Sequence, residues 1–340
     1  MEVRSMFHVN HVAQAFRMIR NHLVIAVIAL GATACGSGSS RYSSLRDFRE
    51  VIKLDILDSG GYPVSNYQIG PEWGRFDIND AVMNTATPQF QRLVKATAAI
   101  GSATGYYLGT HNGIHVLATN NHVIPTDGSC FMTTISFWFG DNFVTDSAYC
   151  RRVIATWKDV DFSLVEIRFM DEVPADRMVG RGVNIRFDAP IQKGRELMMA
   201  GFGVAGVTRH QQFRGTWDAD CKVYSKDNEF RFMSDPDQVN PGEGKVWLFS
   251  LGCDISHGDS GSAIAARDNG DIIGIISTGR IPKNPKVRDA AYLDQIFSSD
   301  SEDVWGELGY AVPAVKIGEY MRRQSSDPVI ASVLRAGNGL

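Results

Sequence analysis

Short runs of β-branched and aromatic residues, separated by Gly, Asn and Asp, repeat from about residue 97 onward. This pattern is typical of an all-β barrel or sandwich. The strands predicted first are residues 105–109, 114–119, 135–139, 151–156 and 162–167. A second set comprises residues 196–203, 221–224, 246–250, 262–266 and 271–278. Residues 188–195, DAPIQKGR, carry Pro and Gly between the two sets, so they are predicted to connect two units.

The chain before the strands begins with a different pattern. Residues 23–34, LVIAVIALGATA, are uncharged, follow Arg17 and Arg20, and are fewer than the roughly 20 residues that span a bilayer. They match a signal-peptide core. We therefore expect residues 1–34 to be a signal peptide and residues 35–96 to be a tether and leader, with a short helix near residues 44–53.

The chain after the strands is more polar. Residues 281–308 are predicted to form a surface insertion. Residues 312–323, VPAVKIGEYMRR, predict a C-terminal helix, because Pro313 suits the first turn of a helix. Residues 326–340 are predicted to be a tail.

Cys35 follows three small residues, Ala32 to Ala34, and precedes the run GSGSS. The arrangement resembles the lipobox and flexible tether of bacterial lipoproteins, with Ala32 where Leu is usual. The resemblance implies lipidation of Cys35 and a lipid anchor in a bacterial membrane, in the periplasm or at the cell surface. The alternative is a plain secretory signal with an incidental cysteine. Both alternatives predict export.

Four further cysteines would then lie in an oxidising compartment, where an even number is expected to pair. Cys130 and Cys150 flank a β-rich stretch that could close as a hairpin, and Cys221 and Cys253 flank the segment leading to a GDSG motif. These two pairs are favoured, although four cysteines also permit two other connectivities. No Cys-x-x-Cys or His-x-x-x-His spacing indicates a structural zinc site.

Composition excludes some classes of partner. The chain has 340 residues, 44% of them hydrophobic, so it is long enough to bury one large or two modest cores. The net charge is −4, without a basic stripe, so nothing indicates nucleic-acid binding.

Three short segments supply the side chains of a nucleophilic catalyst. A serine hydroxyl needs a neighbouring base, and the base needs a third group to hold its tautomer. Ser260 lies in GDSGS, His122 follows an apolar run, and Asp161 directly precedes one. Each residue alone is commonly a turn or structural residue. Their joint occurrence in the order His, Asp, Ser, over residues 122, 161 and 260, favours a catalytic triad and contradicts the α/β-hydrolase order.

The order and spacing resemble those of chymotrypsin- and trypsin-like serine proteases. ATNNHV is similar to the family's Thr-Ala-Ala-His segment, GSATGYYLG to the strand that opens the first barrel, and GYAVP to the closing strand of HtrA-type relatives. The resemblance implies an all-β fold of two six-stranded antiparallel Greek-key barrels with a C-terminal helix. The first barrel would span residues 97–187 and the second residues 188–325.

The resemblance also assigns roles in the site. Ser260 would be the nucleophile, His122 the base and Asp161 its orienting carboxylate, and no metal or cofactor would be needed. The N–H groups of Gly258 and Ser260 would bind the oxyanion. Ser277 would support Asp161, and the main chain of Ser277 and Gly279 would dock a peptide substrate by strand addition.

Two aspartates near Ser260 leave alternatives open. CDISHGDSGSAI also resembles a stretch of bacterial glutamyl endopeptidases. Asp259 occupies the site that pairs with a freed N-terminus in trypsin-type enzymes, so either another cation partners it or cleavage within residues 36–96 activates the enzyme. Asp254 lies six residues before Ser260, the offset at which trypsin-like enzymes place a carboxylate at the base of the substrate pocket. This resemblance favours cleavage after Lys or Arg. The alternative is that Asp254 turns away and bonds to backbone, which leaves a neutral pocket.

The resemblance favours a serine endopeptidase with peptide or protein substrates that acts through an acyl-enzyme. A catalytically silent envelope binding protein of the same fold, or an esterase, would be the alternatives.

Overall fold

The computed structural model describes residues 64–131, 133–139, 144–170, 177–205, 213–236 and 244–340. The predicted signal peptide, Cys35, the GSGSS run and the helix expected near residues 44–53 lie outside the described residues. Among the helices that are described, none combines the length and the hydropathy needed to cross a bilayer.

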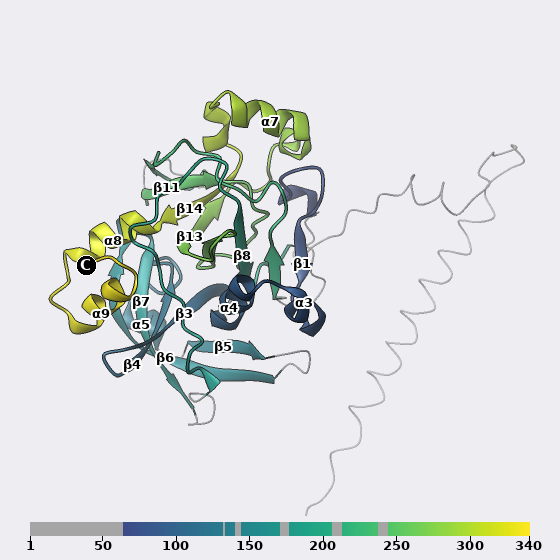
Figure 1. Cartoon of the computed structure of the whole chain (residues 1–340). Coiled ribbons are helices and arrows are strands. Elements are labelled where there is room, and N and C mark those ends of the chain that lie inside the picture. The colour runs from purple at the N-terminus through teal and green to yellow at the C-terminus, as the bar shows by residue number, and fades with distance from the viewer. Residues whose placement is uncertain (1–63, 132, 140–143, 171–176, 206–212, 237–243) are drawn as a thin grey trace, which may run out of the picture. The chain divides into compact units, whose positions relative to one another are not determined.

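The first half of the fold is a closed antiparallel barrel, in the strand order β2-β3-β4-β7-β6-β5 (Figure 1). Each predicted strand of the first set is present, and β2 is an additional strand. Its sequence, TAAI, consists of small residues that give little strand signal. The strands are β2 Thr97–Ile100, β3 Ala103–His111, β4 Ile114–Thr119, β5 Thr134–Phe139, β6 Val144–Trp157 and β7 Phe162–Phe169.

The second half is a larger sheet, in the order β1-β9-β8-β12-β13-β14-β11-β10. Two isolated bridges, Glu196↔Lys222 and Val223↔Leu251, place residues 222–223 between the start of β8 and the end of β11. Five strands and this short segment thereby close into a barrel-like unit. The strands are β1 Arg75–Asp77, β8 Leu197–Gly201, β9 Arg214–Thr216, β10 Arg231–Met233, β11 Val246–Leu251, β12 Ala263–Ala266, β13 Ile272–Gly279 and β14 Gly309–Pro313. The mostly-β architecture agrees with the predicted chymotrypsin-type fold class.

Residues 64–96, expected to be part of a leader, belong to the core. A 3₁₀ turn at Val64–Asn66 and strand β1 are followed by helices α3 (Asp80–Thr85) and α4 (Pro88–Ala96). The Thr87 side chain accepts a hydrogen bond at the start of α4, and Pro88 occupies its first turn. Phe90, on α4, is fully buried, and its ring centroid lies 4.5 Å from that of Trp217.

The C-terminal part is more helical than the sequence predicted. The insertion at 281–308 contains α7 (Ala290–Ser298) between 3₁₀ turns at Pro285–Arg288 and Glu302–Trp305. The predicted C-terminal helix is α8 (Ala314–Arg322). The prediction of a tail at 326–340 is wrong, because these residues form α9 (Pro328–Ala336).

Helix α9 has a physical reason to form. The Asp327 carboxylate accepts hydrogen bonds from the amides of Val329 (2.8 Å) and Ile330 (3.0 Å), which caps the helix. Its apolar face is buried, and His111 Nδ1 on β3 lies 3.0 Å from Ser332 Oγ. Helix α9 therefore lies against β3 of the first barrel, although it follows the second sheet in sequence, while α8 packs on β13, β14 and α9 (Figure 1).

Candidate active site

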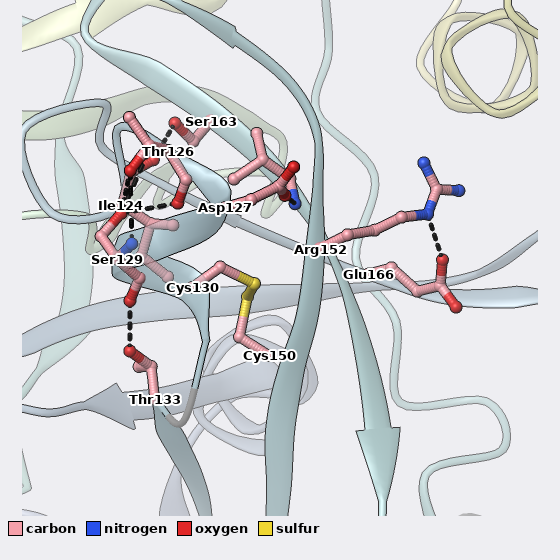
Figure 2. Close-up of a disulfide and its surroundings, with 11 residues drawn as sticks. Ile124, Thr126, Asp127, Ser129, Cys130, Thr133, Cys150, Arg152, Ser163 and Glu166 are labelled. Atoms are coloured by element: carbon pink, nitrogen blue, oxygen red, sulfur yellow. Dashed lines mark hydrogen bonds and ion pairs between the residues drawn. A yellow bond between two sulfur atoms is a disulfide. The ribbon is translucent and has the colours of Figure 1, made fainter.

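His122 follows β4 in a segment that is fixed at several points. Asn120 Nδ2 donates to the main-chain oxygen of Asp161 (2.9 Å), and Ser163 Oγ donates to that of Ile124 (2.8 Å). Helix α5 (Asp127–Cys130) follows, and the disulfide from Cys130 to Cys150 joins it to β6 (Figure 2). The backbone around His122 is therefore tied to both β6 and β7.

Asp161 lies between the 3₁₀ turn Lys158–Val160 and β7, in a left-handed conformation (φ 36°). Its Oδ1 accepts a hydrogen bond from the backbone N–H of His122 (2.9 Å), and its Oδ2 lies 2.8 Å from His122 Nδ1. An ionised carboxylate can only accept, so Nδ1 carries the proton in the neutral ring and Nε2 keeps a lone pair. Asp161 thus selects the tautomer that a general base requires.

Ser277, on β13, adds a contact from the other half of the fold. Its hydroxyl donates to Asp161 Oδ2 over 2.7 Å, and both residues are buried. A hydrogen bond to a carboxylate stabilises its ionised form. This bond also fixes the first barrel against the second sheet beside His122.

The pKa of His122 responds to opposing influences. Burial lowers it, while the hydrogen bond that His122 donates to Asp161 and the negative charges of Asp161 and Asp235 raise it. The net effect is a pKa above the ordinary value of 6.5. His122 therefore becomes a stronger base than a free imidazole.

Ser260 lies in the loop between β11 and β12, which packs on β3. The amide of Thr104 donates to the carbonyl of Ser260 (2.9 Å), and Thr104 Oγ1 donates to that of Gly258 (2.7 Å). Gly258 and Gly261 have φ values of 94° and 88°, which favour glycine. A Cβ on Gly261 would also overlap the carbonyl oxygen of Thr104, so glycine is required there.

The N–H groups of Gly258 and Ser260 are oriented by their peptide planes. The carbonyl of His257 accepts a hydrogen bond from the Val204 amide (2.8 Å), and the carbonyl of Asp259 accepts one from Ser262 (2.9 Å). In a trans peptide the N–H points opposite to the preceding carbonyl. The Gly258 and Ser260 N–H groups therefore point away from Val204 and Ser262.

One cleft, with a volume of about 790 Å³, brings most of the predicted residues together. Its walls include the predicted residues His122, Asp161, Ser260, Ser277 and Gly279, together with the apolar side chains of Phe232, Val246, Ile255, Ile276 and Ile281. Within the part of the chain that the structure describes, no group of three or more His, Cys, Asp or Glu side chains could hold a metal ion.

Asp254 lies elsewhere, contrary to its expected place at the base of a substrate pocket. It is fully buried, and its carboxylate accepts hydrogen bonds from the amides of Ile69 (2.6 Å) and Gly74 (2.8 Å). It is not among the described residues that line the cleft. The geometry matches the alternative in which this aspartate turns away and bonds to backbone. Burial raises its pKa to about 8, although the two amide donors oppose that shift.

The second disulfide joins Cys221 to Cys253, directly before Asp254. Both disulfides therefore have the predicted pairing, and they indicate an exported, non-cytoplasmic protein.

Asp259 has a partner that the sequence did not reveal. Arg75 Nη1 donates to Asp259 Oδ2 (2.7 Å) and Arg75 Nη2 to Oδ1 (3.1 Å). The two residues are 184 positions apart, and no motif near Arg75 marks it as functional. Asp259 therefore has a cation partner, Arg75, other than a freed N-terminus, which was one of its two predicted alternatives.

Comparison with known proteins gives the following result. No protein-family model matches the sequence, and no curated protein matches it. Among solved structures, this chain is similar to the inactive form of the Rv3671c protease, with 15% identity and a TM-score of 0.43 over 73% of this chain and 97% of that one. Its active form from M. tuberculosis gives 16% identity and the same TM-score of 0.43 over 74% of this chain and 88% of that one.

Proposed function

We propose that this protein is a serine endopeptidase. The observation that carries the proposal is the set of hydrogen bonds that the Asp161 carboxylate accepts. It accepts from the backbone N–H and the Nδ1 of His122, and from the hydroxyl of Ser277 on β13. Ser260 lines the same cleft. A buried carboxylate that orients an imidazole in a cleft that a serine also lines has the role of the third member of a catalytic triad.

In the proposed reaction His122 Nε2 accepts the Ser260 hydroxyl proton while Oγ attacks the substrate carbonyl carbon. The tetrahedral intermediate collapses as His122 gives that proton to the leaving amine, which breaks the peptide bond and leaves an ester on Ser260. His122 then takes a proton from water, which attacks the ester carbon; His122 returns that proton to Ser260 Oγ as the ester bond breaks and the acyl group leaves as a carboxylic acid. The Gly258 and Ser260 N–H groups would stabilise the oxyanion in both steps.

A peptide substrate would dock beside β13. Strand β12 pairs with β13 only as far as Ile275, whereas β14 pairs with it as far as Gly279. Among the described strands, the edge of residues 277–279 that faces away from β14 is therefore open, and it borders the cleft. An extended peptide can add to such an edge through main-chain hydrogen bonds.

The wall formed by Ile255 and Gly279 is apolar, and it favours an uncharged substrate side chain. A Cβ on Gly279 would lie 2.8 Å from Ile255 Cδ1, and one on Gly309 would lie 3.0 Å from the same atom. Ile255 therefore fills the space next to these glycines, where Asp254 was expected. We propose cleavage after small or medium apolar residues in place of Lys or Arg.

Labelling with a fluorophosphonate tests the reaction class. The parent protein should gain one covalent adduct, found on Ser260 by peptide mass spectrometry, and Ser260→Ala should gain none. Digestion of a peptide library by the labelling-competent protein should show cleavage after apolar residues. A protein that never labels would be a silent binding module, and one that cleaves only esters would be an esterase.

A further inference from the structure

The Arg75–Asp259 ion pair is buried, and Asp259 directly precedes the candidate nucleophile Ser260. The side chains of Arg75 and Asp259 are 2% and 0% exposed, and their contact is bidentate. Asp259 stands between Gly258 and Ser260, the two residues whose N–H groups would bind the oxyanion. Arg75 comes from β1, which pairs with β9 on the second sheet.

The Asp259 carboxylate also shapes its own loop. Its Oδ2 accepts hydrogen bonds from Ser256 N (2.9 Å) and Ser256 Oγ (3.1 Å), and the Asp259 amide donates to the Ser256 carbonyl (3.1 Å). These contacts close a tight turn around His257 and Gly258. Arg75 therefore neutralises the one carboxylate on which the turn is built.

The same N-terminal segment holds the other end of this loop. The amides of Ile69 and Gly74 donate to the Asp254 carboxylate, and Arg75 Nη1 also donates to the Asp254 carbonyl (3.1 Å). Residues 69–75 thus contact the nucleophile loop at Asp254 and at Asp259, both of which are inaccessible to solvent.

A buried carboxylate without a cation is strongly unfavourable, so it moves toward water or takes up a proton. Either response in Asp259 would release Ser256 and rotate the adjoining peptides. The Gly258 and Ser260 N–H groups would then lose the orientation that their peptide planes now have. Catalysis through an oxyanion site depends on donors that are positioned before the reaction begins.

We infer that Arg75 is a positioning residue, and that residues 69–75 are a permanent part of the active site. The inference rests on the proposed function. It means that the intact chain is competent without a new N-terminus, and that cleavage between residues 69 and 75 would inactivate the enzyme. This is the opposite of activation by removal of the leader.

The test compares Arg75→Gln, Arg75→Lys and the double variant Arg75→Gln/Asp259→Asn with the parent. Asp77→Asn is the matched control, because it removes the Asp77–Arg214 ion pair (2.9 Å) from the same strand without touching the nucleophile loop. Each folded protein is measured for peptide hydrolysis, for its fluorophosphonate labelling rate, and for hydrogen exchange in a peptide covering residues 254–262.

Arg75→Gln should lower kcat by about 100-fold or more, the scale of losing one oxyanion donor, with a smaller change in KM. Exchange in residues 254–262 should accelerate. Arg75→Lys keeps the charge but not the bidentate contact, so it should recover part of the loss. The double variant should lose no more than Arg75→Gln, because the two residues act as one unit. Asp77→Asn should match the parent in all three measurements.

Two outcomes separate this inference from the proposed function. If the parent labels at Ser260 and Arg75→Gln has the parental labelling rate and exchange pattern, the inference is overturned while the protease assignment stands. If the parent neither labels nor hydrolyses peptides, but Arg75→Gln still accelerates exchange in residues 254–262 relative to Asp77→Asn, the positioning role stands and the protease assignment fails.

Discussion

Asp161→Asn tests the triad more sharply than removal of the nucleophile, because it changes one atom and keeps the shape. The His122 backbone N–H faces Oδ1 of Asp161, so the asparagine would place its oxygen there and its NH₂ toward the ring. An NH₂ group donates, so His122 Nδ1 would have to accept and the proton would move to Nε2. The Ser277 hydroxyl can rotate to accept from the same NH₂ group, which stabilises the wrong tautomer.

The expected effect is a fall in kcat of about 10⁴-fold, as for an imidazole held in the wrong tautomer. This corresponds to about 5 kcal/mol of activation free energy. KM should change little, because the Asp161 side chain is buried behind His122. Steady-state hydrolysis of a peptide ester by the folded variant measures the effect, with circular dichroism and thermal unfolding as controls for structure.

Asp159→Asn is the matched control. It removes a carboxylate two residues away whose hydrogen bond, accepted from Tyr320 (3.0 Å), lies outside the proposed triad, so activity should stay near the parental value. If Asp161→Asn kept activity within about tenfold of the parent, the assignment of Asp161 as the orienting group would be wrong.

Three other predictions follow from the same structure. Cys130→Ser and Cys221→Ser each remove a disulfide, one closing a loop of 20 residues and the other a loop of 32 residues. They should lower the free energy of unfolding by about 3 and about 4 kcal/mol, measured by denaturant titration. Unchanged unfolding midpoints would contradict the two disulfides. The acid limb of kcat/KM should have its midpoint above 6.5, because His122 must lose its proton to act as a base and its pKa is raised; a midpoint below 6.5 would refute that cause. Cys35→Ala should release the exported protein from membranes in a fractionation assay, whereas an unmodified parental Cys35 would leave simple secretion.

The sequence predicted best the features that are set by local chemistry. Strand β4 has the predicted bounds, because its apolar run ends at a turn, and β14 coincides with the segment GYAVP that resembles a family strand. The two disulfides also have the predicted partners, since each pair flanks one strand-rich segment. His122, Asp161 and Ser260 were predicted from their order along the chain, and all three line one cleft.

The features that the sequence did not predict depend on contacts across long separations. Asp254 was assigned from its offset to Ser260, but its direction is set by the amides of Ile69 and Gly74, about 180 residues earlier. The sequence around Arg75 does not distinguish it from a surface arginine, because its contact with Asp259 depends on the pairing of β1 with β9. The residues of helix α9 were predicted to be a tail. A helix of nine residues is stable only when another surface buries its apolar face, and the sequence does not show that surface.

The placement of the two described chain ends has a consequence for how the protein is made. Strand β1 precedes the first barrel but pairs within the second sheet, and α9 follows the second sheet but packs on β3 of the first barrel. The first barrel is synthesised before α9, the helix that packs on its strand β3, and β1 is synthesised before its partner strand β9. The complete native structure therefore requires β1 and α9 together with both halves of the fold, and a chain cut near residue 188 would yield two fragments that each lack a segment carried by the other.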